Sequence, residues 1–199
     1  MISHMTPTMM WQVVHLKDIP PTPWRNGGGS TRELLAWPQA DNWEEADAWQ
    51  WRVSVAEIAQ DGPFSSFAGI QRWFAVLGGD GVCLTVGGHM HMLVKGEAPL
   101  AFDGAAHTSC ELLGGATQDF NLMVQAGRSA RMRRVTSSLE LMIKTPKIIA
   151  AYAHSATATV QIGSQKHSLP KQSFGWVVVD ADTLVDVQAP DALVMEIDA

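Results

Sequence analysis

The sequence predicts an all-β protein. Short runs rich in Val, Ile, Leu and aromatic residues recur along the 199-residue chain, and turn residues separate them at short intervals. Helical periodicity is scarce, and only the stretch 39–48 is expected to form a helical turn or a polar loop. This pattern is typical of a β-sandwich or barrel and differs from an alternation of strands and helices.

The expected strands form two series, one before and one after the segment 144–147 (KTPK). The runs on either side of the sequence GGDG at 78–81 form a hairpin, because Gly and Asp supply the positive φ angles of a tight turn. We therefore expect a loose leader over 1–9 and one unit over 10–199, divided into two half-barrels near 144–147. The expected strands are 11–19, 31–37, 49–58, 72–77, 82–86, 89–94, 100–102, 109–113, 120–125, 130–137, 148–153, 157–163, 176–180, 184–188 and 192–198.

Composition excludes several classes of function. The chain is 46% hydrophobic and carries a formal net charge of −6, so it can bury a core but lacks the dense basic patch that nucleic acid requires. No apolar segment approaches the roughly 20 residues that span a bilayer, and the first residues do not match a secretory signal. Cys83 and Cys110 occur without a CxxC motif, which favours thiols in a reducing compartment. We expect a cytoplasmic protein that binds neither membranes nor nucleic acid.

A glycine-rich segment, PWRNGGGST at 23–31, is the most unusual part of the chain. Three consecutive glycines allow successive backbone N–H groups to point in one direction and form an anion-binding nest, with Arg25 beside it. The segment is not a phosphate-binding Walker loop, because no Gly-Lys-Ser/Thr follows. The alternative interpretation is a flexible loop before a strand.

Two expected strands place polar side chains at alternate positions. In WQWRVSVAEI, Arg52 and Ser54 share one face, and in DFNLMVQ, Asp119 and Asn121 share one face. An Arg on a strand face that points into a barrel can bind a carboxylate with two parallel hydrogen bonds. Asp119 and Asn121 can then orient the ligand. The alternative is that both faces are exposed to water.

A histidine pair raises the alternative of a metal site. His89 and His91 lie on one face of an expected strand, and with Glu97 they can coordinate a transition metal. Five residues separate His91 from Glu97, which is longer than the spacing in metal-binding cupins, and His107 lacks a matching second motif. The pair also follows a Gly-Gly sequence, which places it at a hairpin tip in water. We expect no metal and no other cofactor.

Several long motifs together resemble those of the HutD/Ves family. They are PWRNGGGSTREL (23–34), WRVSVAEIAQDGPFSSFAGIQR (51–72), GGDGVCL (78–84), LAFDG (100–104) and LLGG…DFNLM (112–123), in the family's order. The resemblance implies a bicupin, with two RmlC-like cupin β-barrel lobes in one chain and without the usual metal ligands. It also implies an accessory or regulatory role in histidine utilisation, through binding of formylglutamate, urocanate or a related intermediate. The family's motif positions are Trp24, Arg25, Asn26, Gly27, Arg52, Glu57, Asp61, Gly62, Phe64, Asp103, Gly104, Asp119 and Asn121.

Three hypotheses follow. The first is a non-enzymatic protein that binds a small carboxylate ligand, with Arg52 and Arg25 as its cations. The second is a metal-dependent cupin enzyme that acts on a small organic acid or sugar derivative, with His89, His91 and Glu97 as metal ligands. The third is a dimerising structural protein whose Trp-rich faces form the interface. In the first hypothesis the ligand-binding residues are Arg52, Asn26, Arg25, Trp24, Gly27, Glu57, Phe64, Asp103, Asp119 and Asn121.

Overall fold

A computed structural model of the protein describes residues 10–38 and 49–199, and almost all of its regular structure is β-strand. The described helical structure is one 3-10 turn, η1 (Leu16–Asp18). The prediction of an all-β chain is therefore confirmed. The expectations for 1–9 and 39–48 lie outside the described residues. Within the described part of the chain, no helix is long and apolar enough to cross a membrane.

The chain divides into two compact units. The first unit is Leu16–Arg134, and the second is Val135–Ala199 together with the N-terminal segment that ends at His15. Strand β12 (Ala130–Val135) contains the boundary. The segment 144–147, where the sequence suggested a division, lies inside the second unit, at the junction of β13 and β14.

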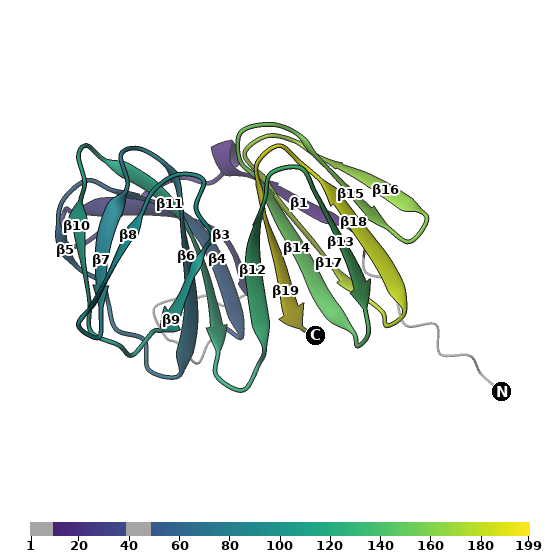
Figure 1. Cartoon of the computed structure of the whole chain (residues 1–199), viewed down its shortest axis with the longest axis horizontal. Coiled ribbons are helices and arrows are strands. Elements are labelled where there is room, and N and C mark those ends of the chain that lie inside the picture. Colours follow the sequence, from purple (N-terminus) through teal and green to yellow (C-terminus); the bar gives the residue numbers. More distant parts are fainter. Residues whose placement is uncertain (1–9, 39–48) are drawn as a thin grey trace. The chain divides into compact units, whose positions relative to one another are not determined.

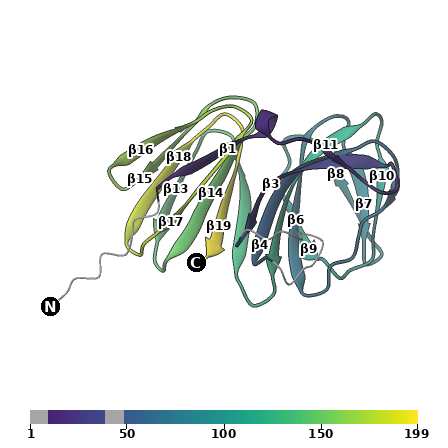
Figure 2. The same ribbon diagram turned by 180° about the vertical axis from the view of Figure 1, so that it is seen from behind.

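The first unit consists of two antiparallel sheets (Figures 1 and 2). The larger sheet has the order β2-β3-β4-β11-β6-β9, and the smaller has the order β5-β10-β7-β8. Strands of the larger sheet are β2 (Thr22–Pro23), β3 (Gly29–Trp37), β4 (Trp51–Ile58), β11 (Thr117–Gln125), β6 (Ile70–Gly78) and β9 (Leu100–Asp103). Strands of the smaller sheet are β5 (Gly62–Pro63), β10 (Thr108–Leu112), β7 (Val82–Val86) and β8 (His89–Leu93).

The turn at 78–81 joins β6 to β7, but β6 belongs to the larger sheet and β7 to the smaller one, where it pairs with β10 and β8. The prediction that these two strands form a hairpin is therefore wrong. Gly79 and Gly81 have φ angles of +87° and +96°, and a Cβ on Gly81 would lie 2.4 Å from the carbonyl oxygen of Leu93. No larger residue fits this turn without moving the backbone. The apolar core of the first unit lies between its two sheets and includes Phe74 from β6, Leu84 from β7 and Cys110 from β10.

The second unit repeats the arrangement of two facing sheets. One sheet contains the run β1-β17-β14-β19 and continues to the boundary strand β12, and the other has the order β13-β18-β15-β16. The strands are β1 (Gln12–His15), β17 (Ser173–Val179), β14 (Lys147–Ala153), β19 (Ala192–Asp198), β13 (Ser138–Ile143), β18 (Thr183–Gln188), β15 (Ala158–Ile162) and β16 (Gln165–Leu169). The sequence had not predicted β13 and β16. In both units, the hydrogen-bonded ladders of the described strands form separate sheets and no closed barrel.

Candidate functional site

Strand register brings a set of polar side chains to the interior of the first unit. Arg52 on β4 lies opposite Met123 on β11, and Ser54 lies opposite Asn121. These positions share one face of the sheet with Ile58, a residue of the core between the two sheets, and the alternate positions of the same strands, such as Val53, are buried on the other face. Arg52 is only 6% exposed and Asn121 only 7%. Burial excludes the alternative in which both polar strand faces are exposed to water.

Arg52 is held by an ion pair that the sequence did not predict. Its Nε donates to Glu33 Oε2 at 2.6 Å, and its Nη1 lies 3.9 Å from the sulfur of Met123. Glu33 comes from β3, where a register irregularity between Glu33 and Leu35 adjusts its position against β4. The Glu33 side chain is 30% exposed, so this pair lies where the interior meets solvent.

A second set of side-chain hydrogen bonds links β6 to β11. Arg72 Nη2 donates to Asn121 Oδ1 at 3.1 Å, and Asn121 Nδ2 donates to Asp119 Oδ1 at 2.6 Å. Because the amide oxygen accepts from one neighbour and the amide nitrogen donates to the other, these two contacts fix the orientation of Asn121. Asp119 is 1% exposed and Arg72 is 7% exposed. The structure therefore places a buried Arg-Asn-Asp relay inside an apolar core.

Both ends of this relay carry an unsatisfied atom. Arg72 Nε and Asp119 Oδ2 are buried and have no hydrogen-bond partner within residues 10–38 and 49–199. A buried polar atom without a partner is unfavourable by roughly 1–3 kcal/mol. Such atoms are expected where a ligand or an ordered water completes the hydrogen bonding.

Burial shifts the pKa values of both charged ends. Burial lowers the pKa of Arg72 to about 10, although the nearby Asp119 opposes this shift. Burial raises the pKa of Asp119 to about 8, while its hydrogen bond from Asn121 and the charge of Arg72 act in the opposite direction. At neutral pH Arg72 is therefore a cation, and the neutral carboxylic acid is the main form of Asp119.

Aromatic rings surround the Arg72 guanidinium. Its central carbon lies 5.1 Å from the centre of the Phe64 ring, 5.2 Å from Phe102 and 5.9 Å from Phe67. Aromatic faces stabilise a buried cation, but they supply no hydrogen-bond acceptor. An anion that enters this space meets a cation with one unsatisfied N–H and apolar walls.

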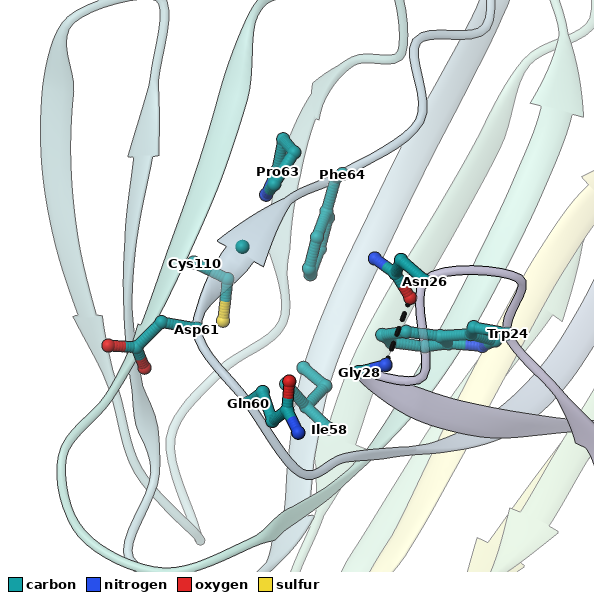
Figure 3. A pocket seen from close by; sticks show the side chains of 10 residues that line it. Trp24, Asn26, Gly28, Ile58, Gln60, Asp61, Pro63, Phe64 and Cys110 are labelled. Atoms are coloured by element: carbon teal, nitrogen blue, oxygen red, sulfur yellow. Dashed lines mark hydrogen bonds between the residues drawn. The ribbon is translucent and has the colours of Figure 1, made fainter.

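A small pocket opens beside this cluster (Figure 3). The pocket, together with the solvent at its mouth, contains about 220 Å³ of empty space, and its enclosed part is about the size of one water molecule. Phe64 contributes to the pocket wall, and its ring also lies against the Arg72 guanidinium, so this residue is shared by the pocket and the polar relay. The lining residues are Trp24, Asn26, Gly28, Ile58, Gln60, Asp61, Gly62, Pro63, Phe64 and Cys110.

The glycine-rich segment forms a tight hairpin at the pocket mouth. Gly27 N donates to the Trp24 carbonyl at 3.0 Å, and Gly28 N donates to Asn26 Oδ1 at 3.0 Å. A Cβ on Gly29 would lie 2.1 Å from the carbonyl oxygen of Glu57, so this position requires glycine. Two of the three glycine N–H groups are thus used inside the hairpin. The anion nest that the sequence suggested lacks those two donors.

The remaining predicted ligand residues lie apart from the relay. Arg25, Glu57 and Asp103 are exposed, and Asp103 Oδ1 accepts from the backbone N–H of Ala105 at 2.9 Å. The sequence prediction thus combined an interior group, Arg52, Asp119 and Asn121, with residues of the surface and of the pocket mouth.

The alternative metal ligands are not brought together either. His89 and His91 lie on β8, and Glu97 Oε2 accepts from the backbone N–H of Val94 at 3.3 Å in the following turn. Gly87 and Gly88 before them have positive φ angles, so the pair begins just after a hairpin turn. Among the residues that the structure describes, no three His, Cys, Asp or Glu side chains form a group that can hold a metal ion.

Sequence reasoning missed Arg72 and Glu33. Arg72, Phe74 and Val76 alternate along IQRWFAVLG, which marks Arg72 as an inward residue of a strand with an apolar core face. That signal was present in the sequence. Glu33 gave no comparable signal, because its pairing with Arg52 depends on the irregular register between β3 and β4.

The fold defines the class of protein first. Cupin-fold proteins share it: salicylate 1,2-dioxygenase from Pseudoaminobacter salicylatoxidans matches 98% of this chain and 84% of its own with a TM-score of 0.62 at 10% identity. The chain thus has a cupin-like, all-β fold. The model of the HutD family matches residues 16–195. The chain belongs to the HutD family.

Relatives at higher identity agree with this assignment. HutD from Pseudomonas fluorescens SBW25, solved in a formate condition, is 30% identical, has a TM-score of 0.78 and covers 95% of this chain and 98% of its own. An uncharacterised 21.2 kDa protein from the hutC 3' region of Pseudomonas putida is 40% identical over 72% of this chain and 75% of its own length. Protein Ves of Cronobacter sakazakii is 33% identical over 60% of this chain and 64% of its own.

Proposed function

We propose that the first unit binds a small carboxylate ligand between its two sheets, and that the protein acts as a non-enzymatic accessory or regulatory factor in histidine utilisation. The observation that supports this proposal best is the unsatisfied Nε of Arg72, buried among three aromatic rings. A charge-assisted hydrogen bond to a carboxylate would satisfy this atom.

The charges of the interior also favour a single anion. Arg52 is balanced by Glu33, whereas Arg72 faces a carboxyl group whose pKa is raised to about 8. With Asp119 neutral, the four groups sum to one positive charge near neutral pH. A ligand with one carboxylate in the interior would neutralise it, and charges buried in apolar surroundings require such pairing.

The choice of ligand comes from the family. The relative from P. putida is named for its place beside hutC, and HutD carries the same prefix, which refers to histidine utilisation. Formylglutamate and urocanate are carboxylates of that pathway and remain our proposed ligands. The enclosed part of the pocket is smaller than either molecule, so we propose that Phe64 turns aside when the ligand enters.

The proposal includes four further points from the sequence. Each unit corresponds to one lobe of a bicupin, the protein is cytoplasmic, it binds neither DNA nor membranes, and it can form a homodimer. A formal net charge of −6 supports the point on DNA. A gel shift with sub-micromolar affinity that weakens with salt would contradict it.

Calorimetric titration of formate, formylglutamate and urocanate tests the function. The wild-type protein should bind at least one of them, and the ligand should raise the melting temperature. Arg72→Ala should weaken binding about tenfold or more, equivalent to about 1.4 kcal/mol or more, and Arg72→Lys should recover part of the loss. Arg131→Ala, an exposed cation of the same unit, serves as the matched control and should bind normally. Equal affinities for Arg72→Ala and Arg131→Ala would contradict the proposed site.

A further inference from the structure

Asp119 is buried on all sides in the interior of the first unit. Its neighbours in register are Ala56 on β4 and Val76 on β6, and both of these side chains are apolar and buried. Oδ1 accepts one hydrogen bond from Asn121, and Oδ2 has no partner among the described residues. An ionised carboxylate at this position would lack the hydrogen bonds and the ion pair that usually stabilise a buried negative charge.

The surrounding charged and titratable groups do not change this conclusion. Arg72 donates a hydrogen bond to Asn121, which in turn donates to Asp119, so Arg72 and Asp119 are linked by hydrogen bonds through Asn121. The guanidinium of Arg52 is paired with Glu33. Cys110, on the opposite sheet, is electrostatically coupled to Asp119, and burial followed by the charge of Asp119 raises the pKa of its thiol to about 12. Cys110 is therefore a neutral thiol.

The hydrogen-bond pattern also locates the proton of the neutral acid. Oδ1 already accepts from the amide nitrogen of Asn121, so the hydroxyl of the acid lies on Oδ2. The unsatisfied atoms of the relay are then two donors, Asp119 Oδ2–H and Arg72 Nε–H. Two donors and one cation suit a carboxylate anion.

Resting on the proposed function, we propose that Asp119 binds the ligand carboxylate as a neutral carboxylic acid, donating from Oδ2 while Arg72 donates from Nε. The ligand is therefore held together with one proton. At pH values where Asp119 of the ligand-free protein is ionised, Asp119 must take up a proton for each ligand that binds. Binding then becomes weaker as the pH rises.

The expected size of the effect follows from the fraction of protonated Asp119. A group with a pKa of about 8 is about nine-tenths protonated at pH 7 and about one-tenth protonated at pH 9. If only the protonated form binds, the affinity falls about tenfold between these pH values. The carboxylates of formate and formylglutamate are ionised throughout this range, so their titration adds nothing.

Titration of formate and formylglutamate into wild-type protein and an Asp119→Asn variant, at pH 7 and pH 9, tests this role. An asparagine amide can accept from Asn121 and permanently donates to the ligand, so its binding should be equal at both pH values. Wild-type protein should bind about tenfold more weakly at pH 9. Asp180→Asn, an exposed carboxyl in the second unit, is the matched control and should behave as wild type.

A second readout does not depend on any variant. Binding enthalpies measured at pH 9 in buffers of different ionisation enthalpy should show uptake of about one proton per ligand by the wild type, against about a tenth of a proton at pH 7. Wild-type affinity that rises or stays level with pH, or an Asp119→Asn variant that folds but fails to bind at either pH, would overturn the role of Asp119.

The outcomes separate this inference from the function on which it rests. If binding requires Arg72 but shows no proton uptake, the carboxylate site stands and the neutral-acid role of Asp119 is wrong. If none of formate, formylglutamate and urocanate binds to wild-type protein at any pH, both are overturned.

Discussion

The two units have the same arrangement of facing antiparallel sheets, but they fill the space between the sheets differently. In the second unit the core cluster is apolar, with small side chains such as Ala151, Ala158 and Val160 in close contact, and the buried polar side chains of Tyr152 and Ser173 are uncharged. In the first unit, Arg72 and Asp119 occupy the corresponding space between sheets and end in unsatisfied atoms. The described residues of the second unit bury no charged side chain, so this fold has no structural need for buried groups such as Arg72 and Asp119.

This difference shows where to look for function in a repeated fold. Buried polar groups without partners lower stability, and they persist where a ligand completes their hydrogen bonding. The second unit therefore provides an internal reference. Changes in its core should alter stability alone, whereas changes in the relay of the first unit should alter ligand binding.

The largest effect on stability is expected in the second unit. Ile149 is fully buried in its core cluster, so Ile149→Ala should lower the free energy of unfolding by about 2–5 kcal/mol through lost burial and a residual cavity. Denaturant unfolding measures this loss. Ligand affinity under native conditions should be unchanged, and a parallel loss of affinity would show that the second unit also takes part in binding.

A smaller loss is expected when the Arg52–Glu33 pair is broken. Arg52→Ala leaves Glu33 partly buried without its cation, and because Glu33 is 30% exposed we expect a loss of about 1–3 kcal/mol, below the range for fully buried pairs. The double variant Arg52→Met/Glu33→Gln should recover part of it, which a double-mutant cycle of unfolding free energies measures.

The Arg52→Ala variant also tests the ligand-binding role that the sequence predicts for Arg52. The sequence suggested that Arg52 is the main carboxylate ligand, whereas the structure engages its Nε with Glu33. Arg52→Ala should therefore weaken ligand binding less than Arg72→Ala. A greater loss of affinity in Arg52→Ala would restore Arg52 as the main contact.

The amount that the sequence could predict differs between single strands and their pairing. Alternation within a strand placed Arg52 on one face and Asp119 with Asn121 on another, and the structure puts all three in one interior. Which strands are neighbours, and in which register, is set by long-range packing that a single sequence does not reveal. The Arg52–Glu33 pair depends on a register irregularity and was out of reach for that reason.

Local composition explains the missed elements. Strand β16, QKHSL, is too polar to resemble a strand, and its position follows from its pairing with β15. Strand β13 has Leu139, Leu141 and Ile143 at alternate positions, a strand pattern that the sequence itself contains. Arg72 follows the same alternation, because it shares one strand face with the apolar residues Phe74 and Val76.

The pH dependence of stability gives a third test. The pKa of Asp119 is about 8 in the folded protein and near 4 in an unfolded chain, so between these values the folded state binds more protons. Stability that depends on this proton is present below about pH 4 and is lost as the pH rises towards 8. Asp119→Asn removes this dependence.

The free energy of unfolding of Asp119→Asn minus that of the wild type should thus be larger at pH 8 than at pH 5. The expected increase is at least about 1.4 kcal/mol, the equivalent of one pKa unit. Unfolding free energies of ligand-free protein at both pH values measure the difference. If the difference between variant and wild type is the same at both, Asp119 is ionised in the folded protein and the interior of the first unit carries no net positive charge.

The smallest effects are expected at the histidines of the two edge strands. His167 on β16 stacks on Trp11 with ring centres 5.3 Å apart, whereas His89 on β8 is exposed. His167→Ala should lower the free energy of unfolding by about 0.5–1.5 kcal/mol, the usual contribution of an aromatic pair. His89→Ala/His91→Ala should change it by less than about 0.5 kcal/mol, as is usual for surface substitutions.

Elemental analysis of both variants also tests the alternative of a metal-dependent enzyme, because we expect no stoichiometric metal in protein purified without added metal. About one equivalent of a transition metal in the wild type, lost in His89→Ala/His91→Ala and kept in His167→Ala, would move the functional site from the interior relay to β8.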